Sequence, residues 1–164
     1  MENVKIKKAN IKEGLFLYVE FTEELQGHNR KENKINSTVP IHEDLKNSFD
    51  ALHRHLAILC DEVNVSKKSE FSELVFPAFD ARGFTIGGST ESGVTISGSK
   101  DGKYGTVNLN TPFTKYDESE YPYMPELTLD IEACIYEVEQ YLFEGKRAPE
   151  KQIAIEFPEE MEVD

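Results

Sequence analysis

The chain opens with alternating apolar and polar positions, which is the period of a β-strand. Residues 4–11 follow this alternation and predict a half-buried strand, and residues 15–22, rich in aromatic and branched side chains, predict a second, more central strand. The polar residues 23–34 predict a loop or a long hairpin connection. A short third strand is expected at residues 35–39, because Pro40 has no amide proton to donate to a sheet.

After residue 42 the apolar positions follow the period of a helix. One amphipathic helix is predicted over residues 42–61, with its apolar face turned to the core. That face is formed by Leu45, Phe49, Leu52, Leu56 and Leu59. A second helix is predicted over residues 125–143, because Pro125 suits a first helical turn and Gly145 suits the position after the last turn. Residues 63–76 have no clear period and are interpreted as a linker that could include one short element.

Three more strands are expected between the two helices, at residues 83–88, 93–98 and 104–109, separated by hairpin turns. The complete order is therefore three strands and a helix, repeated. It predicts an α+β fold in which antiparallel sheet structure carries both amphipathic helices on one face. We expect a single domain over residues 1–145, followed by an acidic, exposed tail at residues 146–164. The repeated order also suggests an internal duplication of residues 1–62 and 82–145, with two three-stranded sheets joined edge to edge.

Charge is unevenly distributed along the chain. The 164 residues include 18 basic and 31 acidic ones, a net charge of −13, and residues 111–164 alone contain fifteen acids and four bases. A field of this sign repels phosphate backbones and anionic membranes, so direct nucleic-acid binding is expected to be unfavourable. Solubility is an alternative explanation for the charge. The acids of the second predicted helix form a candidate acidic surface made of Glu126, Asp130, Glu132, Glu137 and Glu139.

The sequence predicts a protein of a reducing cytoplasm. Its first residues lack the basic stretch and the apolar run of a signal peptide, and no segment approaches about 18 consecutive apolar residues. Neither export nor a membrane span is expected. The two cysteines, Cys60 and Cys134, make no disulfide framework and are expected to be reduced residues of the core.

The sequence carries no familiar signature of catalysis or metal binding. It has no phosphate loop ending in Gly-Lys-Ser/Thr, no Gly-x-Ser-x-Gly elbow and no zinc-type Cys/His spacing. His53 and His55, two positions apart on a predicted helix, point in opposite directions and cannot share a metal. We expect His53 beside the apolar stripe and His55 nearer the solvent. The prediction is a protein that is not an enzyme, with no catalytic residue, no cofactor and no metal.

Small and basic residues around the predicted hairpins form a candidate ligand loop. Glycine and serine leave backbone amides accessible to a small anion, and nearby lysines would add positive charge. The candidate residues are Gly87, Gly88, Ser89, Gly98, Lys100 and Lys103. Ordinary hairpin turns require the same residue types, so a purely structural role is the alternative.

The tail contains a short motif of its own. Residues 152–157 have the form Gln-x-x-aliphatic-x-Phe, which resembles the hexapeptide by which bacterial and phage proteins dock on the replicative sliding clamp. The resemblance implies that Gln152 would bind a polar subsite and that Ile155 and Phe157 would fill an apolar groove. It departs from the usual pattern by having isoleucine where leucine is common. Alternatively, residues 153–157 form a last edge strand.

Several segments resemble those of small uncharacterised proteins carried by bacteriophages and prophages. They are residues 83–88, 93–98, 108–113 and 141–146. The resemblance implies a bacterial host cytoplasm during infection, where small acidic proteins act on replication, recombination or host defence. It brings no assigned reaction and no site residues with it.

Three functions remain as expectations. The first is a non-enzymatic protein that binds a host or phage nucleic-acid-processing or defence protein, by acidic mimicry of DNA. The second is a small-ligand binding protein that recognises a nucleotide signal. The third is a replication or recombination accessory that docks on the sliding clamp through its tail. A homodimer formed through sheet edges is also compatible with the predicted strands.

Overall fold

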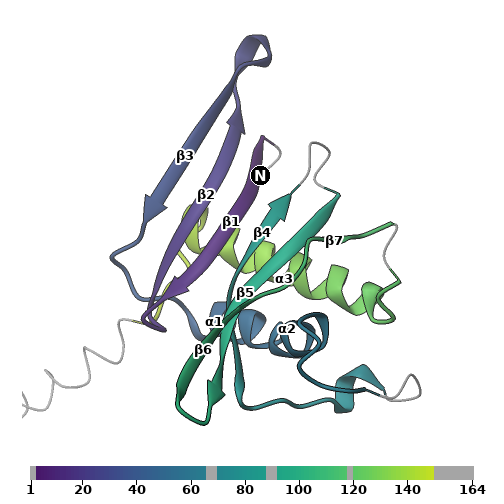
Figure 1. The fold of residues 1–164 in the computed structure, drawn as a ribbon. Helices are drawn as coiled ribbons and strands as arrows, with labels where there is room; N and C mark the ends of the chain where they lie inside the picture. Colours follow the sequence, from purple (N-terminus) through teal and green to yellow (C-terminus); the bar gives the residue numbers. More distant parts are fainter. Residues whose placement is uncertain (1–2, 66–69, 88–91, 118–119, 150–164) are drawn as a thin grey trace, which may run out of the picture.

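The computed structural model describes residues 3–65, 70–87, 92–117 and 120–149. One open antiparallel sheet has the strand order β3-β2-β1-β4-β5-β6, and a short strand, β7, pairs with β5 (Figure 1). The strands are β1 (Val4–Lys12), β2 (Phe16–Glu24), β3 (Arg30–Asn36), β4 (Phe79–Gly87), β5 (Gly93–Gly102), β6 (Gly105–Asn110) and β7 (Thr114–Lys115). The predicted α+β class with an antiparallel sheet is confirmed.

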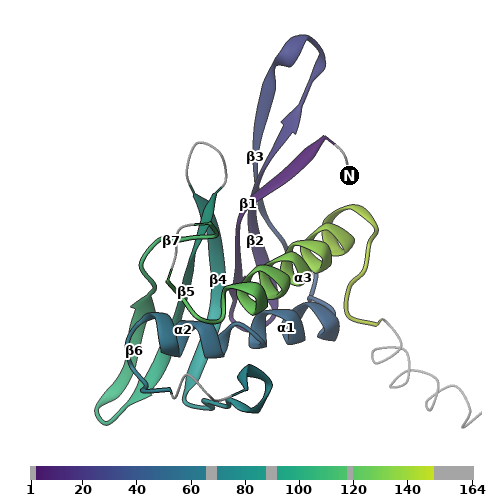
Figure 2. The same ribbon diagram turned by 90° about the vertical axis from the view of Figure 1, so that its right-hand side faces the viewer.

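Among the described segments, three α-helices lie on one side of this sheet. They are α1 (Glu43–Asp50), α2 (His53–Leu59) and α3 (Met124–Phe143), with two 3-10 turns, η1 (Gln26–His28) and η2 (Phe71–Glu73), in the connections. Figure 2 shows the helices stacked against one face, so that the molecule has two layers. Helix α1 contacts α3 and β4, α2 contacts β4 and β5, and α3 contacts β1. None of the helices in the described segments is both long and apolar enough to cross a bilayer.

The core fills the space between the two layers. Side chains from β1 and β2 (Ala9, Leu17, Val19), from β4 and β5 (Phe84, Val94, Ile96) and from the helices (Phe49, Leu56, Leu127, Ile131, Val138) are all buried. Strand residues that face this core alternate with polar ones, which explains why the period-2 pattern predicted β1 and β2 closely.

The predicted helix over residues 42–61 is bent into two helices. The apolar stripe continues through the bend, because Leu45, Phe49, Leu52 and Leu56 are all buried. At the bend, the Leu52 amide bonds to the Phe49 carbonyl at 3.0 Å, a tightened turn that separates α1 from α2. The periodicity therefore identified the buried face but not the break.

The third strand lies earlier than the sequence pattern predicted. It spans Arg30–Asn36, and it pairs with β2 from Glu24 to Tyr18 through a long polar hairpin. The hairpin extends beyond the helices (Figure 1), so much of it has solvent on both faces and needs no apolar alternation. This is why a polar segment interpreted as a loop or a long hairpin connection contains the end of β2 and most of β3.

The interval interpreted as a linker with room for one short element contains η2, whose Phe71 is buried. The start of the predicted tail also remains attached to the body, because the Ala148 amide donates to the Pro40 carbonyl at 3.1 Å. The pairing of β1 with β4 places the two strand-strand-strand units side by side. The internal duplication itself stays a prediction.

Glycine at position 98 allows α2 to approach the sheet closely. A Cβ atom there would lie 2.1 Å from the Asp80 carbonyl oxygen and 2.8 Å from Leu56 Cδ2. Real Cβ atoms do not approach backbone oxygens so closely, so any larger residue forces β4 or α2 to move.

We therefore predict that Gly98→Ala lowers the free energy of unfolding by about 1–3 kcal/mol, measured by urea denaturation. The adjacent substitution Ser97→Ala is the matched control, because that side chain projects from the other face of β5. It should change stability by less than about 0.5 kcal/mol. Equal effects of the two substitutions would contradict the close packing of α2 on Gly98.

Candidate functional site

The solvent face of α3 carries an exposed apolar stripe. Leu129 and Tyr136 are 65% and 58% exposed, and Ala133 between them is also exposed. Spacings of four and three residues place all three on one face of the helix. Scattered exposed apolar residues are ordinary in proteins, but an aligned set on a well-packed helix marks a candidate contact surface. We call Leu129, Ala133 and Tyr136 the α3 stripe.

The predicted acidic residues lie on α3 but do not form one continuous surface. Asp130 and Glu137 are engaged inside the molecule, with His55 and Lys146 respectively, at 2.8 and 2.9 Å. Glu132 is exposed, whereas Glu126 and Glu139 are half-buried. The carboxylates therefore lie on either side of the α3 stripe, and two of the five already have cationic or histidine partners.

A buried histidine fixes α3 to α2. His55 is fully buried, with Nδ1 2.7 Å from the Tyr121 hydroxyl and Nε2 2.8 Å from Asp130 Oδ2. A carboxylate only accepts hydrogen bonds, so Nε2–H donates to Asp130 and Nδ1 accepts from the Tyr121 hydroxyl. The ring also stacks on Phe71, with centroids 4.5 Å apart. The expectation that His55 lies nearer the solvent is wrong.

The reason for that error is the position of α3. On a single helix His53 and His55 flank the apolar stripe on opposite sides, and only the packing of α3 against one side decides which is covered. His53 stays partly exposed and lies 2.5 Å from the Asp50 carbonyl oxygen. A histidine and an aspartate 75 residues apart give no local sequence signal.

Burial determines the protonation of this cluster. Loss of solvent lowers the pKa of His55 below its ordinary value, although the hydrogen bond to Asp130 acts in the opposite direction. Burial also raises the pKa of the Tyr121 hydroxyl, so that it remains a donor. Within the described residues, the charges of Arg54 and Glu126 also act on His55. The ring is a neutral structural link, enclosed on all sides.

We predict that stability falls as the pH drops below about 6.5, the ordinary histidine pKa. The folded pKa is lower than the unfolded one, so the unfolded chain binds more protons in this window and acid favours it. His55 contributes a slope of at most about 1.4 kcal/mol per pH unit, measured by urea denaturation at a series of pH values.

Replacement by glutamine tests the assignment of that slope. His55→Gln should remove the His55 contribution between about pH 7.5 and 5.5, while the control His53→Gln should retain it. Equal pH dependence of the unmodified chain and of His55→Gln between these pH values would contradict a neutral, buried His55.

Both thiols are protonated at neutral pH. Cys134 is fully buried and donates from Sγ to the Ser48 carbonyl at 3.2 Å, and burial raises its pKa to about 12. Burial, with the nearby Glu62 carboxylate, also raises the pKa of the half-buried Cys60. Protonated thiols are poor nucleophiles.

A thiol reagent should therefore distinguish the two cysteines. Ellman's reagent is predicted to label Cys60 first and slowly, and to label Cys134 only when the chain is unfolded. The Cys60→Ser variant, followed by absorbance, should show almost no reaction in the native state. Fast labelling of that variant at neutral pH would contradict the enclosure of Cys134.

The structure does not gather the predicted ligand-loop residues. Gly87 lies at one end of the β4–β5 pair, where a Cβ would meet the Phe113 ring at 2.8 Å, and Gly98 contacts α2. Lys100 pairs with Glu62 on the helix side, and Lys103 lies over the Tyr104 ring beyond the far end of β5. At about 3.3 Å per residue, Gly87 and Lys103 are roughly 30 Å apart. Gly88 and Ser89 lie outside the described residues.

Two predictions concern the tail motif and metal binding. Gln152, Ile155 and Phe157 of the clamp-like motif lie outside the described residues, so that motif stays a prediction. Within residues 3–65, 70–87, 92–117 and 120–149, no group of three or more histidine, cysteine or acidic side chains is arranged to hold a metal ion.

Comparison of the chain with protein-family models, with curated proteins and with solved structures gives no match in any of the three. The resemblance to bacteriophage and prophage proteins therefore stays a prediction.

Proposed function

We propose that the protein is a non-catalytic interaction protein that binds a nucleic-acid-processing or defence protein through the outer face of α3. The observation that carries the proposal is the α3 stripe, with Leu129 and Tyr136 exposed on one helix face. Partly buried aromatic and aliphatic anchors supply most of the affinity in protein interfaces. The neighbouring carboxylates complement a basic partner and disfavour an acidic one.

The polar contacts that fix α3 to the rest of the molecule favour partner binding through its outer face. His55 holds Asp130 near the start of the helix, and Lys146 bonds to Glu137 near its end while also pairing with Asp44 of α1 at 2.8 Å. The helix is therefore anchored at both ends to the rest of the molecule. A rigid helix loses little conformational entropy on binding, which leaves more of the contact energy for affinity.

The partner that fits this face is a protein whose binding groove is apolar in the middle and rimmed by lysine and arginine. Grooves that hold nucleic acid commonly combine those features, because they stack bases and neutralise phosphates. With Asp130 and Glu137 already paired inside the molecule, the exposed Glu132 and the half-buried Glu126 and Glu139 would provide the acidic mimicry. The apolar stripe would provide much of the affinity.

The other expected functions have less support. The ligand-loop residues are spread along β4, β5 and their hairpins, so they do not support a nucleotide-signal pocket. Clamp docking rests on the motif at residues 152–157 alone. The absence of catalysis remains part of the proposal, supported by the enclosure of His55 and Cys134 and by the raised pKa of both thiols.

The test uses two matched double variants in affinity capture from bacterial extract, followed by identification of the bound protein. Leu129→Ala/Tyr136→Ala removes the α3 stripe, and alanine keeps the helix. Leu15→Ala/Tyr104→Ala removes a comparable exposed pair elsewhere, since those residues are 46% and 93% exposed. The stripe variant is expected to weaken binding at least about tenfold, or about 1.4 kcal/mol, and the control variant less than about twofold.

Two further outcomes decide the nature of the partner. The captured protein should be one that processes nucleic acid, and duplex DNA and added salt should each displace it, because they compete for the same basic groove. Capture that is unchanged by the stripe substitutions, or insensitive to both duplex DNA and salt, would overturn the proposal.

A further inference from the structure

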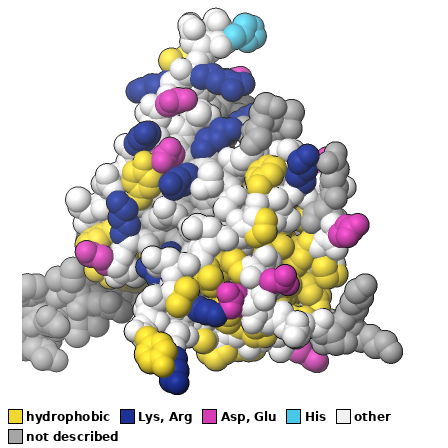
Figure 3. All heavy atoms as spheres, viewed as in Figure 1, with side chains coloured by type: hydrophobic (Ala, Val, Ile, Leu, Met, Phe, Trp, Pro, Cys, Tyr) yellow, Lys and Arg dark blue, Asp and Glu magenta, His cyan; other side chains and the backbone are white. Residues whose placement is uncertain are grey.

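The sheet face that the helices do not cover is basic, in contrast to the chain as a whole. Figure 3 shows lysine and arginine side chains gathered over β1, β2 and β3 on this face, with fewer acidic ones between them. The sequence has the same asymmetry. Residues 1–42 contain seven Lys or Arg and six acids, whereas residues 43–164 contain eleven and 25. The excess of negative charge therefore lies outside the β1–β3 half of the sheet.

A groove opens on this face where β1 and β4 separate. In the part of the chain that the structure describes, the two strands pair over Lys8–Asn10 and Gly83–Thr85, and beyond Asn10 they diverge. The resulting groove has a volume of about 490 Å³. Its lining includes Lys12 of β1, Arg82 of β4, and Asn108 and Asn110 of β6. A space of this size accommodates a nucleotide unit.

Unpaired amides line the groove. In the described part of the chain, no hydrogen bond engages the side chains of Asn10, Asn108 or Asn110. Asn10 lies flat across Gly83, where an added Cβ would be 1.6 Å from Asn10 Oδ1. Each amide presents donors and an acceptor, which is the combination that pairs with the edges of nucleobases.

The charges of the groove are only partly neutralised. Arg82 donates to Ser99 and lies 3.5 Å from Asp80, and Lys12 donates to Asn36 at 3.2 Å. Guanidinium has five N–H donors and ammonium three, so both retain capacity for phosphate oxygens. Glu13 also lines the groove, one carboxylate against two cations.

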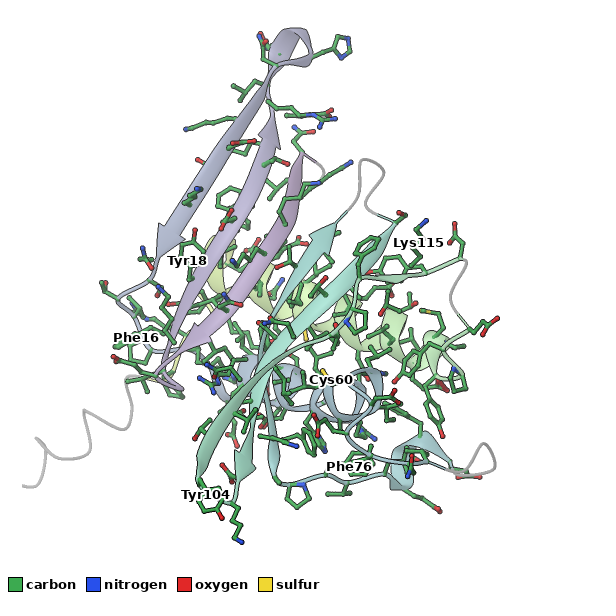
Figure 4. The ribbon with its side chains drawn as sticks, in the orientation of Figure 1. Phe16, Tyr18, Cys60, Phe76, Tyr104 and Lys115 are labelled. Atoms are coloured by element: carbon green, nitrogen blue, oxygen red, sulfur yellow. The ribbon has the colours of Figure 1, made fainter. Side chains whose placement is uncertain are left out.

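Aromatic rings lie beside the groove. Phe16 and Tyr18 project from β2 near its hairpin with β1 (Figure 4), and they pair across the ladder with Lys12 and Asn10. Lys12 Nζ lies 4.9 Å from the Tyr18 ring centroid, and the Tyr18 hydroxyl donates to Glu20 at 2.8 Å. Aromatic side chains beside cations on a sheet are stacking platforms for unpaired bases.

We infer that this sheet face binds single-stranded nucleic acid, with phosphates at Lys12 and Arg82, base edges at the asparagines and bases stacked on Tyr18 and Phe16. An unpaired strand fits better than a duplex, because the edges and faces that these side chains contact are exposed only in unstacked bases. Lys8 and Lys34 lie on either side of Glu20 in the sheet and add positive charge beyond the groove. The proposed site therefore extends past one nucleotide.

The net charge of −13 does not exclude this binding. Charges interact over about 10 Å at moderate salt, and the acidic helix layer lies behind the sheet at about that distance. This inference goes beyond the proposed function, because it assigns nucleic acid to the face of the molecule opposite to α3.

The experiment measures fluorescence anisotropy of a labelled 20-residue oligothymidylate titrated with the full chain at about 50 mM salt. Saturable binding that weakens with added salt is expected. Lys12→Gln/Arg82→Gln should raise Kd at least about tenfold, whereas Lys46→Gln/Lys103→Gln, which removes the same charge on α1 and at a distant hairpin, should change it less than about twofold. Asn108→Ala/Asn110→Ala should weaken binding without changing the salt dependence. Thermal melting checks that each variant is folded.

Four results would overturn the inference. They are no saturable binding by the unmodified chain, equal weakening by the two charge variants, equal or tighter binding of a duplex, and equal competition by thymidine monophosphate at the same nucleotide concentration. The last would indicate a site for a single nucleotide only. None of these variants changes α3. A negative result for nucleic-acid binding therefore does not contradict the proposed protein interaction, and a negative result for the protein interaction does not contradict nucleic-acid binding.

Discussion

The whole sheet depends on a short junction in its middle. Among the described residues, three pairs, between Lys8–Asn10 and Gly83–Thr85, join the half built from β1–β3 to the half built from β4–β6. Such a short ladder would be weak alone, and the helices reinforce it by packing across it. Helix α3 contacts β1, α1 and α2 contact β4, and α1 contacts α3. The core beneath the junction therefore carries much of the cohesion between the halves.

The helix layer is in turn secured by polar contacts that the apolar core could not provide. His55 joins α2 to α3 and to the segment that carries Tyr121, and it does so fully enclosed. A buried histidine with both nitrogens satisfied fixes orientation, because any rotation of α3 would break a directional bond. Lys146 has the same effect at the other end of α3, between Asp44 and Glu137. The outer face of α3 is consequently presented in one fixed orientation.

The sequence predicted the elements of the fold that are buried on one face and solvated on the other. Strands β1 and β2 and helix α3 have one face in the core and one in solvent, so their periods were visible. Strand β3 was misplaced because its hairpin is largely solvated, and the break between α1 and α2 was missed because the apolar stripe runs through it. The role of His55 was not predictable, since it depends on which side of α2 is covered by a helix about seventy residues away in the chain. The net charge likewise gave the total for the chain, but it did not reveal that basic and acidic residues are distributed differently over the sheet face and the helix layer.

The groove between β1 and β4 begins where the hydrogen-bonded ladder between them ends. Lys12 belongs to one half of the sheet, and Arg82, Asn108 and Asn110 belong to the other. A strand of nucleic acid bound in the groove would contact residues of both halves of the sheet. It would therefore link the two halves beyond the last backbone pair between β1 and β4. Binding at this face would then raise the resistance of the entire domain to mechanical and thermal unfolding. The reason is that a ligand which binds the folded state in preference shifts the folding equilibrium towards that state.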